Sequence, residues 1–244
     1  HNKACADCII YDCIEKLSRE DISKKLKGNK AEIIIGKLPE DITNQVDLLV
    51  ISPGVPVDSP IVEQFKKAEV PVWGEIELAY NYDKGRIIAI TGTNGKTTTT
   101  ALVGQIVKAY NEKPFVVGNI GNSYTGEVLN SSYDSYTVAE ISSFQLETIH
   151  KFHPVVSAIL NITPDHLNRH HTMECYSKTK ENISMNQTKD DVCVLNMEDE
   201  ELYRFGSECP AKVVWFSSKR KPEIGAYVQG DDIRYTDGTT DELM

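Results

Sequence analysis

The sequence has no apolar run long enough to cross a bilayer and no cluster of basic residues. A membrane-spanning helix needs about 20 consecutive apolar residues, so we expect no membrane partner. The 26 Lys and Arg residues are outnumbered by 36 Asp and Glu residues, which leaves a net charge of −10. This balance argues against a nucleic acid or an anionic membrane surface as a partner. No signal peptide begins the chain, so we expect a cytoplasmic protein.

Paired metal-ligating cysteines are also missing. The six cysteines include Cys5 and Cys8, whose C-x-x-C spacing is typical of metal and redox sites, but no second C-x-x-C or Cys/His pair accompanies them. Cys8 begins an apolar run that is typical of a buried strand. We therefore interpret the cysteines as separate reduced thiols of a cytosolic protein.

The length and the two ends of the chain indicate part of a larger protein. The 244 residues suffice for one large domain or two modest ones, and 40% hydrophobic with 25% charged residues is ordinary for a globular protein. The first residue is His1 rather than Met, and a polar stretch ends at Met244. We expect a fragment that is cut at both ends.

Residues 91–98, with the sequence TGTNGKTT, follow an apolar run over 86–90. A short β-branched run, a glycine-rich turn and a Lys-Thr pair that begins a helix are typical of a phosphate-binding loop. Lys96 supplies a cation for the β- and γ-phosphates, and the Thr97 hydroxyl can reach Mg²⁺. The loop is a compact variant, because the common G-x-x-x-x-G-K-T spacing would require glycine at Ile90. We predict that a nucleoside triphosphate binds through Gly92, Thr93, Asn94, Gly95, Lys96, Thr97 and Thr98.

Short apolar runs alternate with helical segments, which predicts an α/β fold with a mainly parallel, doubly wound sheet. The first part has predicted strands over 8–11, 31–35, 46–51 and 70–73, a helix capped by Ser18 that ends at Gly28, and helices over 60–68 and 74–82. The second part has predicted strands over 87–90, 115–117, 136–141, 155–160, 192–195 and 213–216, helices near 96–110, 172–184 and 198–205, and an antiparallel hairpin over 226–235. A turn-rich stretch, residues 81–85, lies between the parts. We predict an incomplete Rossmann-like N-terminal unit over 1–84 and a P-loop-type central ATPase domain over 85–244.

Polar residues follow four of these strands at the carboxyl edge of the predicted sheet, where parallel sheets bind their ligands. The four loops are residues 91–97, 118–121, 140–147 and 161–170. Glu140 directly follows an apolar strand, and Mg²⁺ bound to ATP takes oxygen ligands from one or two carboxylates. We assign Glu140 and Thr97 to Mg²⁺, and we expect Asp165 and His166 to serve a second metal or the substrate.

Three other residues near this edge carry less information. Lys180 lies on the predicted helix 172–184, four residues after Tyr176, so both share one helix face. The chemistry of Lys180 alone indicates a surface lysine. His170 and His171 are consecutive histidines in a loop, which need no ligand.

Several strings in the sequence resemble the Mur ligases. They are SPGV at 52–55, GEIEL at 74–78, TGTNGKTT at 91–98, GNIG at 118–121, EISSFQLE at 140–147, LNITPDHLNRH at 160–170 and Tyr176-x-x-x-Lys180. The resemblance runs from about residue 46 to residue 196. The phosphate loop is common to all Mur ligases and to folylpolyglutamate synthase, whereas SPG, GEIEL and SSFQLE together resemble the members that add D-glutamate.

The resemblance implies a three-domain cytoplasmic enzyme of peptidoglycan synthesis that uses ATP and Mg²⁺, and we expect a monomer. ATP would phosphorylate the carboxylate of UDP-N-acetylmuramoyl-L-alanine (UDP-MurNAc-L-alanine), and the amine of D-glutamate would attack the acyl phosphate. The resemblance also implies a carbamylated Lys180 whose carbamate oxygen reaches the second metal. The implied catalytic residues are Lys96, His166 and Lys180, the implied metal ligands are Thr97, Glu140, His166 and Lys180, and the implied substrate contacts are Ser52, Pro53, Gly54 and Asn119.

The chain departs from the family pattern in two ways. Asn168 stands where the family usually has Asp, which puts in doubt a role for that carboxylate. Against the family pattern, we expect the strand and glycine turn of the first domain, the end of the central domain and the C-terminal domain to lie outside this fragment. We expect Asp12 to be what remains of the uracil side of the substrate site.

Two other functions stay open. Another ligase of the superfamily, such as folylpolyglutamate synthase, would share the phosphate loop, but GEIEL and SSFQLE argue against it. A non-catalytic nucleotide- or UDP-sugar-binding protein would share the fold. The joint presence of five site residues argues against loss of the activity. They are Lys96, Thr97, Glu140, His166 and Lys180.

Overall fold

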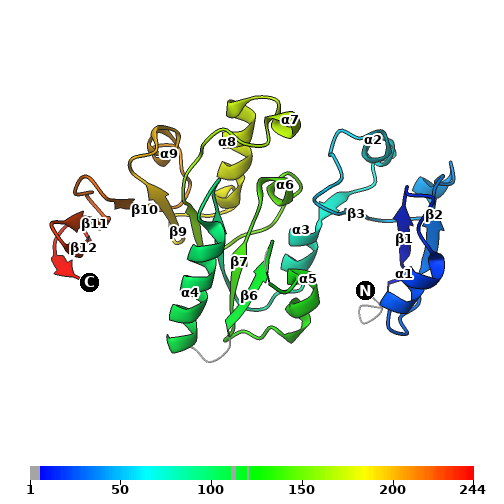
Figure 1. Cartoon of the computed structure of the whole chain (residues 1–244), viewed down its shortest axis with the longest axis horizontal. Coiled ribbons are helices and arrows are strands. Elements are labelled where there is room, and N and C mark those ends of the chain that lie inside the picture. Colours follow the sequence, from blue (N-terminus) through cyan, green and yellow to red (C-terminus); the bar gives the residue numbers. More distant parts are fainter. Residues whose placement is uncertain (1–5, 111–113, 120) are drawn as a thin grey trace.

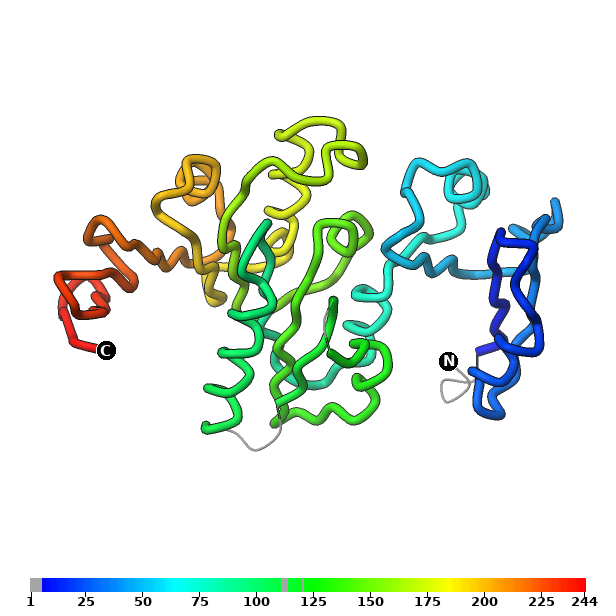
Figure 2. The backbone as a smooth tube through the Cα atoms, viewed as in Figure 1, coloured from blue at the N-terminus to red at the C-terminus, as the bar shows by residue number. Residues whose placement is uncertain are grey.

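The computed structural model describes residues 6–110, 114–119 and 121–244. Cys5 of the C-x-x-C pair and Ile120 of the GNIG string lie outside the described residues. The chain is elongated, with the N-terminal strands at one end, a large sheet and its helices in the middle, and the C-terminal strands at the other end (Figure 1). Figure 2 follows the backbone along this path. Within the described ranges, no helix combines the length and the apolar character that crossing a bilayer requires.

The N-terminal part alternates short parallel strands with helices, as predicted. Its strands form two separate two-stranded sheets, β1 with β2 and β3 with β4. Ser18 accepts a hydrogen bond from the backbone N–H of Asp21 and caps the first helix, which lowers the cost of its exposed N–H groups. The elements are β1 (Ile9–Asp12), α1 (Arg19–Lys25), β2 (Glu32–Ile35), η2 (Ile42–Asn44), β3 (Leu49–Ile51), α2 (Pro60–Lys67), β4 (Val72–Gly74) and α3 (Glu75–Tyr80).

A nine-stranded sheet runs from the middle of the molecule to its C-terminal end (Figure 1), in the order β13-β12-β11-β10-β9-β8-β5-β7-β6. The pairs from β6 to β11 are parallel, and β12 pairs in the antiparallel sense with β11 and β13. The mainly parallel sheet and the hairpin are therefore confirmed. The elements are β5 (Arg86–Thr91), α4 (Lys96–Tyr110), β6 (Pro114–Gly118), α5 (Tyr124–Glu127), η3 (Val128–Asn130), β7 (Tyr136–Glu140), α6 (Ser143–Leu146), β8 (Val156–Ile159), α7 (Leu167–His170), α8 (Met173–Glu181), η4 (Asn182–Ser184), β9 (Val192–Asn196), α9 (Glu200–Gly206), β10 (Lys212–Ser217), β11 (Gly225–Gln229), β12 (Asp232–Thr236) and β13 (Asp241–Leu243).

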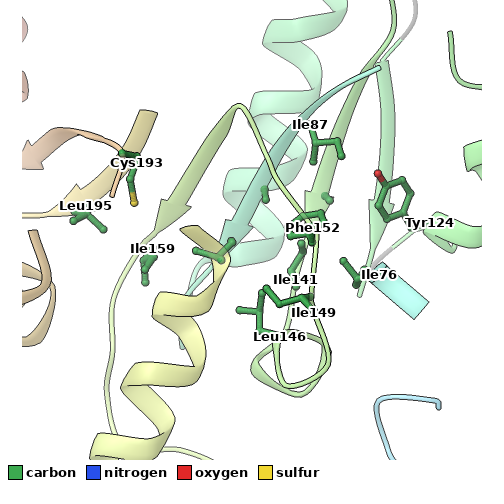
Figure 3. Packing of buried hydrophobic residues seen from close by; sticks show 14 of the residues in the cluster. Ile76, Ile87, Tyr124, Ile141, Leu146, Ile149, Phe152, Ile159, Cys193 and Leu195 are labelled. Atoms are coloured by element: carbon green, nitrogen blue, oxygen red, sulfur yellow. The ribbon is translucent and has the colours of Figure 1, made fainter. Parts of the chain in front are cut away.

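Both faces of the central strands of the large sheet are covered, which these apolar strands require. Successive side chains of β5 point to opposite faces. Ile87 joins the larger core, which Figure 3 shows from close by and which also receives residues of α3, α8 and α9. Ile90 lies in a second cluster, against Val103 and Val107 of α4. The long helix α4 therefore covers one face, and the shorter helices cover the other.

Helix α3 packs into the core of the central part. Ile76 and Ala79 are buried there, and Glu77 between them is also fully buried. The Glu77 carboxylate accepts hydrogen bonds from three consecutive backbone N–H groups, those of residues 150–152, at 2.8, 2.8 and 3.0 Å. A buried carboxylate must be paired or hydrogen-bonded to be tolerated. Glu77 thus anchors α3 to the segment before β8.

Three four-residue helices, α5, α6 and α7, are absent from the sequence-based prediction, because so short a segment shows no 3.6-residue period. A local signal for α6 does exist. Ser142 and Gln145 form a capping box, in which each side chain bonds the other's backbone N–H. Gln145 Nε2 also donates to Glu75 Oε1 at 2.5 Å. Gln145 therefore links the cap of α6 to the first residue of α3.

Candidate active site

The strand order brings four loops to one edge of the sheet. Strand β5 lies between β8 and β7, and β6 lies beyond β7. Thr91 at the end of β5 is in register with Ile159, and Ile90 is in register with Glu140. The loops that follow these strands therefore lie side by side, as the predicted parallel sheet requires.

The phosphate loop connects β5 to α4 and is held in shape by the loop after β8. Gly92 and Gly95 have φ of 148° and 83°, a backbone region that favours glycine. A Cβ at Gly92 would lie 3.1 Å from Leu160 Cβ, so this position also needs a small residue. Asn94 N donates to Asn161 Oδ1 at 2.8 Å, and Asn161 Nδ2 donates back to Asn94 O at 3.0 Å. The loop is therefore held in shape by hydrogen bonds to the loop after β8, and it leads into the N-terminus of α4, where an anion can bind.

Lys96 is the first residue of α4, and its ammonium folds over the loop. Its Nζ donates to the carbonyl oxygens of Gly92 and Thr93, each at 2.8 Å. Thr97 and Thr98 follow in the first turn and are exposed. The structure thus places a cation and two hydroxyl-bearing residues at a helix N-terminus, where the helix dipole favours negative charge.

Lys180 is buried, with 2% of its surface exposed, so the prediction of a surface lysine is wrong. Its Nζ donates to Gly92 O at 2.9 Å and lies 4.7 Å from the centroid of the Tyr176 ring. Tyr176 holds the loop as well, through a 3.1 Å hydrogen bond between its hydroxyl and that of Thr93. Burial, and then the nearby charge of Lys96, lower the pKa of Lys180 to about 7. A buried lysine of this kind carries a substantial neutral fraction at neutral pH.

Glu140 is buried at the end of β7, with 1% of its surface exposed. Its Oε1 accepts a hydrogen bond from Asn119 Nδ2 at 2.9 Å, and its backbone carbonyl accepts one from Asn119 N at 2.9 Å. Its Oε2 is also buried, and no hydrogen-bond partner for it exists among the described residues. A carboxylate oxygen in this state is free to accept a cation.

His166 stands at the other side of the loop cluster. It is in the left-handed backbone region, with φ of 51°, and is the N-cap residue directly before α7. Its side chain is 48% exposed, its Nε2 lies 3.5 Å from Asp165 Oδ2, and its ring packs 4.9 Å from the Phe144 ring. Within the ranges that the structure describes, His166 forms no hydrogen bond or ion pair with Glu140 or Lys180, and no group of three or more His, Cys, Asp and Glu residues could hold a metal.

The turn at Ser52, Pro53 and Gly54 faces the central part of the molecule. It is closed by a 2.9 Å hydrogen bond from Val55 N to Ser52 O. The turn lines a small cleft whose opposite wall contains residues of α6 and the segment after it. The lining residues are Ile51, Ser52, Pro53, Val55, Gly74, Glu75, Phe144, Gln145 and Thr148.

Gly74 allows the two parts to approach closely at this cleft. A Cβ at Gly74 would lie 2.2 Å from Thr148 Oγ1, which no side chain can tolerate without a shift. The backbone N–H of Gly74 donates to Thr148 O at 3.4 Å, and His150 Nε2 lies 2.9 Å from Val72 O. The end of β4 therefore packs directly against residues 148–150.

Comparison with known proteins decides the family. The family profile described as the Mur ligase middle domain matches residues 90–244. This chain belongs to the Mur ligase family. A second profile, that of the Mur ligase MurD-like N-terminal domain, matches residues 7–74.

Relatives of this Mur ligase chain are similar over its whole length. It is 75% identical, over 243 residues and 100% of the chain, to the UDP-N-acetylmuramoylalanine–D-glutamate ligase of Lachnospira eligens, of which it covers 54%. The chain thus spans about half the length of the curated relatives it matches.

Solved structures show the same fold. The UDP-N-acetylmuramate:L-alanyl-gamma-D-glutamyl-meso-diaminopimelate ligase of Neisseria meningitides has a TM-score of 0.59 at 15% identity, over 97% of this chain and 78% of that one. The MurF ligase of Thermotoga maritima, solved in complex with ADP, has a TM-score of 0.50 at 15% identity, over 83% of this chain and 56% of that one.

The structure of this Mur ligase chain also shows polar residues that sequence reasoning missed. His170 is buried, with its Nε2 3.0 Å from Ser143 Oγ, and burial is the largest cause of its lowered pKa. Arg169 and Glu147 form a nearly buried ion pair at 2.6 Å. Arg169 belongs to the string LNITPDHLNRH and Glu147 to EISSFQLE, but the sequence alone does not pair the two residues. Asn168, where the family pattern has Asp, is exposed.

Proposed function

We propose that this chain belongs to an ATP-dependent amide ligase that joins D-glutamate to UDP-MurNAc-L-alanine in peptidoglycan synthesis. The name of a relative that is 75% identical supports the two substrates. The observation that carries the chemistry is the convergence of Lys96 and Lys180 on the phosphate loop, at an edge shared with the buried carboxylate of Glu140. Transfer of a phosphoryl group to a carboxylate brings anions together, so the site must supply cations, which here would be the ammonium of Lys96 and the metal ions that Glu140 and a modified Lys180 would hold.

The proposed reaction has two steps. A carboxylate oxygen of UDP-MurNAc-L-alanine attacks the γ-phosphorus of ATP, which forms an acyl phosphate and releases ADP. The amine nitrogen of D-glutamate then attacks the acyl carbon, phosphate leaves, and the nitrogen loses a proton to give the amide. The N–H groups of the phosphate loop and the ammonium of Lys96 would bind the phosphates and stabilise the charge that develops during transfer.

Glu140 fits the Mg²⁺ that the family resemblance implies. Its Oε2 is buried without a hydrogen-bond partner among the described residues, and Mg²⁺ prefers carboxylate oxygens with phosphates as co-ligands. We propose that Glu140 and the exposed hydroxyl of Thr97 hold this ion, and that His166 and Lys180 serve a second one. When bound, Mg²⁺ would neutralise charge on the transferred phosphoryl group.

Lys180 is proposed to carry a carbamate. The neutral amine, favoured by the lowered pKa, is the form that adds to the carbon of CO₂, and the nitrogen then releases a proton. The product replaces a cation by an anion with two oxygen ligands. This change supports a metal-binding role for a residue that would otherwise repel Mg²⁺.

We propose that the two parts of the chain bind different substrates. Residues 1–84 would form part of the UDP-substrate domain, and residues 85–244 would bind ATP. Ser52 and Pro53 line a cleft against the central part, Gly54 lies in the same turn, and Asn119 contacts Glu140, which supports substrate contacts at these positions. We further propose that the protein acts in the cytoplasm as a monomer.

Phosphate release by the full-length protein tests this function. The complete mixture contains UDP-MurNAc-L-alanine, ATP, Mg²⁺ and D-glutamate, and each component is omitted in turn. We expect release to require all four, and the product to gain the mass of one glutamate residue. Release with a folate acceptor in place of the sugar nucleotide would support a folylpolyglutamate synthase instead. No release in the complete mixture would support a binding protein.

A further inference from the structure

Arg169 connects three segments that are far apart in the sequence. Its Nε and Nη2 donate to the two carboxylate oxygens of Glu147, at 3.2 and 2.6 Å. The same Nη2 donates to the carbonyl oxygen of Val55 at 2.9 Å. Helix α7, the segment after α6 and the loop after β3 therefore meet at one guanidinium group.

The surroundings of Arg169 hold it in one conformation. The side chains of Arg169 and Glu147 are 12% and 10% exposed, so water screens the pair only weakly. The guanidinium carbon lies 5.0 Å from the centroid of the Phe144 ring, which limits the motion of the group. A planar guanidinium can bind a carboxylate through two donors and still serve a further acceptor, which an ammonium does less well.

Both ends of this connection lie beside residues of the proposed site. Val55 follows Gly54 directly and closes the turn at 52–54 through its N–H. Arg169 lies on the one-turn helix α7, whose N-cap residue is His166, and its backbone N–H donates to His166 O at 2.9 Å. A single side chain thus spans from the turn that lines the cleft to the helix that carries His166.

We propose that Arg169 is a positioning residue that holds the turn at 52–54 at a fixed distance from His166, and that it thereby sets the affinity for the sugar-nucleotide substrate. This inference rests on the proposed function, because it takes residues 52–54 as substrate contacts. Arg169 itself touches only protein groups in the described structure, and acts through the carbonyl of Val55 and the carboxylate of Glu147.

Steady-state kinetics of the full-length protein test the role of Arg169. We expect Arg169→Met to raise KM for UDP-MurNAc-L-alanine at least tenfold, while KM for ATP changes less than threefold. Arg169→Lys should restore part of the loss, since it keeps the charge but not the forked geometry. The matched control is Arg204→Met, which removes an arginine that pairs with Glu181 at 3.0 Å on the surface of the central part. The control should leave both KM values unchanged. Equal increases in both KM values would overturn the proposal.

Hydrogen exchange of the same variants needs no substrate. It tests whether Arg169 holds the turn at 52–54 separately from whether the turn sets the affinity for the sugar nucleotide. Arg169→Met should speed amide exchange in peptides that contain Val55, with unchanged exchange in peptides from β1 and β2. If exchange at Val55 in Arg169→Met equals that of the wild type, Arg169 does not hold the turn. This result would overturn the proposal whatever the kinetics. Faster exchange with an unchanged KM for the sugar nucleotide would overturn the link to substrate. A wild-type protein that binds the sugar nucleotide but does not ligate D-glutamate would refute the proposed function alone. In that case the dissociation constants of the wild type and the variants for the sugar nucleotide replace the KM values.

Discussion

Lys96 and Lys180 donate hydrogen bonds to one acceptor, the carbonyl oxygen of Gly92, at 2.8 and 2.9 Å. Lys96 begins α4, and Lys180 lies near the end of α8. The two side chains meet at the phosphate loop. Two ammonium groups this close repel each other, and their mutual charge contributes to the lowered pKa of Lys180. The carbonyl oxygen of Gly92 therefore holds both amine groups at the phosphate loop, and their proximity favours the neutral form of Lys180 while Lys96 keeps its charge for the phosphates.

Lys96→Ala is expected to abolish ligation by the full-length protein and to leave the fold intact. The ammonium is used to stabilise charge on the phosphates, and loss of such a group typically costs about 3 to 4 kcal/mol of barrier. Circular dichroism and phosphate release measure the two effects separately. Turnover within tenfold of the wild-type rate would contradict the assignment.

The burial of Lys180 predicts a stability that rises with pH. Its folded pKa is about 7, below the ordinary value of 10.5, so the unfolded chain binds more protons between these two values. The cost of burying the charge is fully present below pH 7 and disappears as the pH rises toward 10.5. We expect the wild type to gain about 2 kcal/mol between pH 7 and 9 relative to Lys180→Met. Urea unfolding in CO₂-free buffer measures this difference, and parallel pH profiles would refute it.

Glu140→Gln should raise the Mg²⁺ concentration needed for half-maximal activity at least tenfold. Glutamine can still accept the hydrogen bond from Asn119, so the strand end should keep its shape, but it lacks the charged oxygen that would face the cation. A titration of activity with Mg²⁺ at saturating ATP measures the effect. The matched control is Glu174→Gln, an exposed glutamate on α8. An unchanged Mg²⁺ requirement in the Glu140 variant would show that this carboxylate is not a ligand.

Gly74→Ala is expected to destabilise the contact between β4 and the central part by about 1 to 3 kcal/mol, because the new methyl group overlaps Thr148 Oγ1. Removing that hydroxyl in the double variant Gly74→Ala/Thr148→Ala should recover part of the loss. Gly54→Ala serves as the control, since no atom lies within 4 Å of its added Cβ. Denaturant unfolding checks all three variants. Equal stability of the Gly74 and Gly54 variants would mean that the two parts are not tightly packed here.

Local patterns were enough to predict the phosphate loop and the order of the longer helices and of the strands up to β12. The β-branched run before Gly92 and the Lys-Thr pair after it define a strand, a turn and a helix within fifteen residues. The burial of Lys180 could not be predicted in this way, because its acceptor, Gly92 O, is 88 positions away. The contact between Arg169 and Val55 spans 114 positions, and depends on how two separately folded segments dock. Such contacts follow from tertiary packing, which periodicity does not report.

The side chain of Gln145 couples the N-terminal part to the start of α6, because it bonds to both. Its amide nitrogen donates to Glu75 at the start of α3, while its amide oxygen accepts from the cap residue Ser142. A rotation of the N-terminal part that pulled on Glu75 would therefore loosen the helix cap two residues after Glu140. Movement of one part would reach the strand end that carries Glu140 through the Gln145 amide, in addition to the contacts of Gly74 with Thr148 and of Arg169 with Val55.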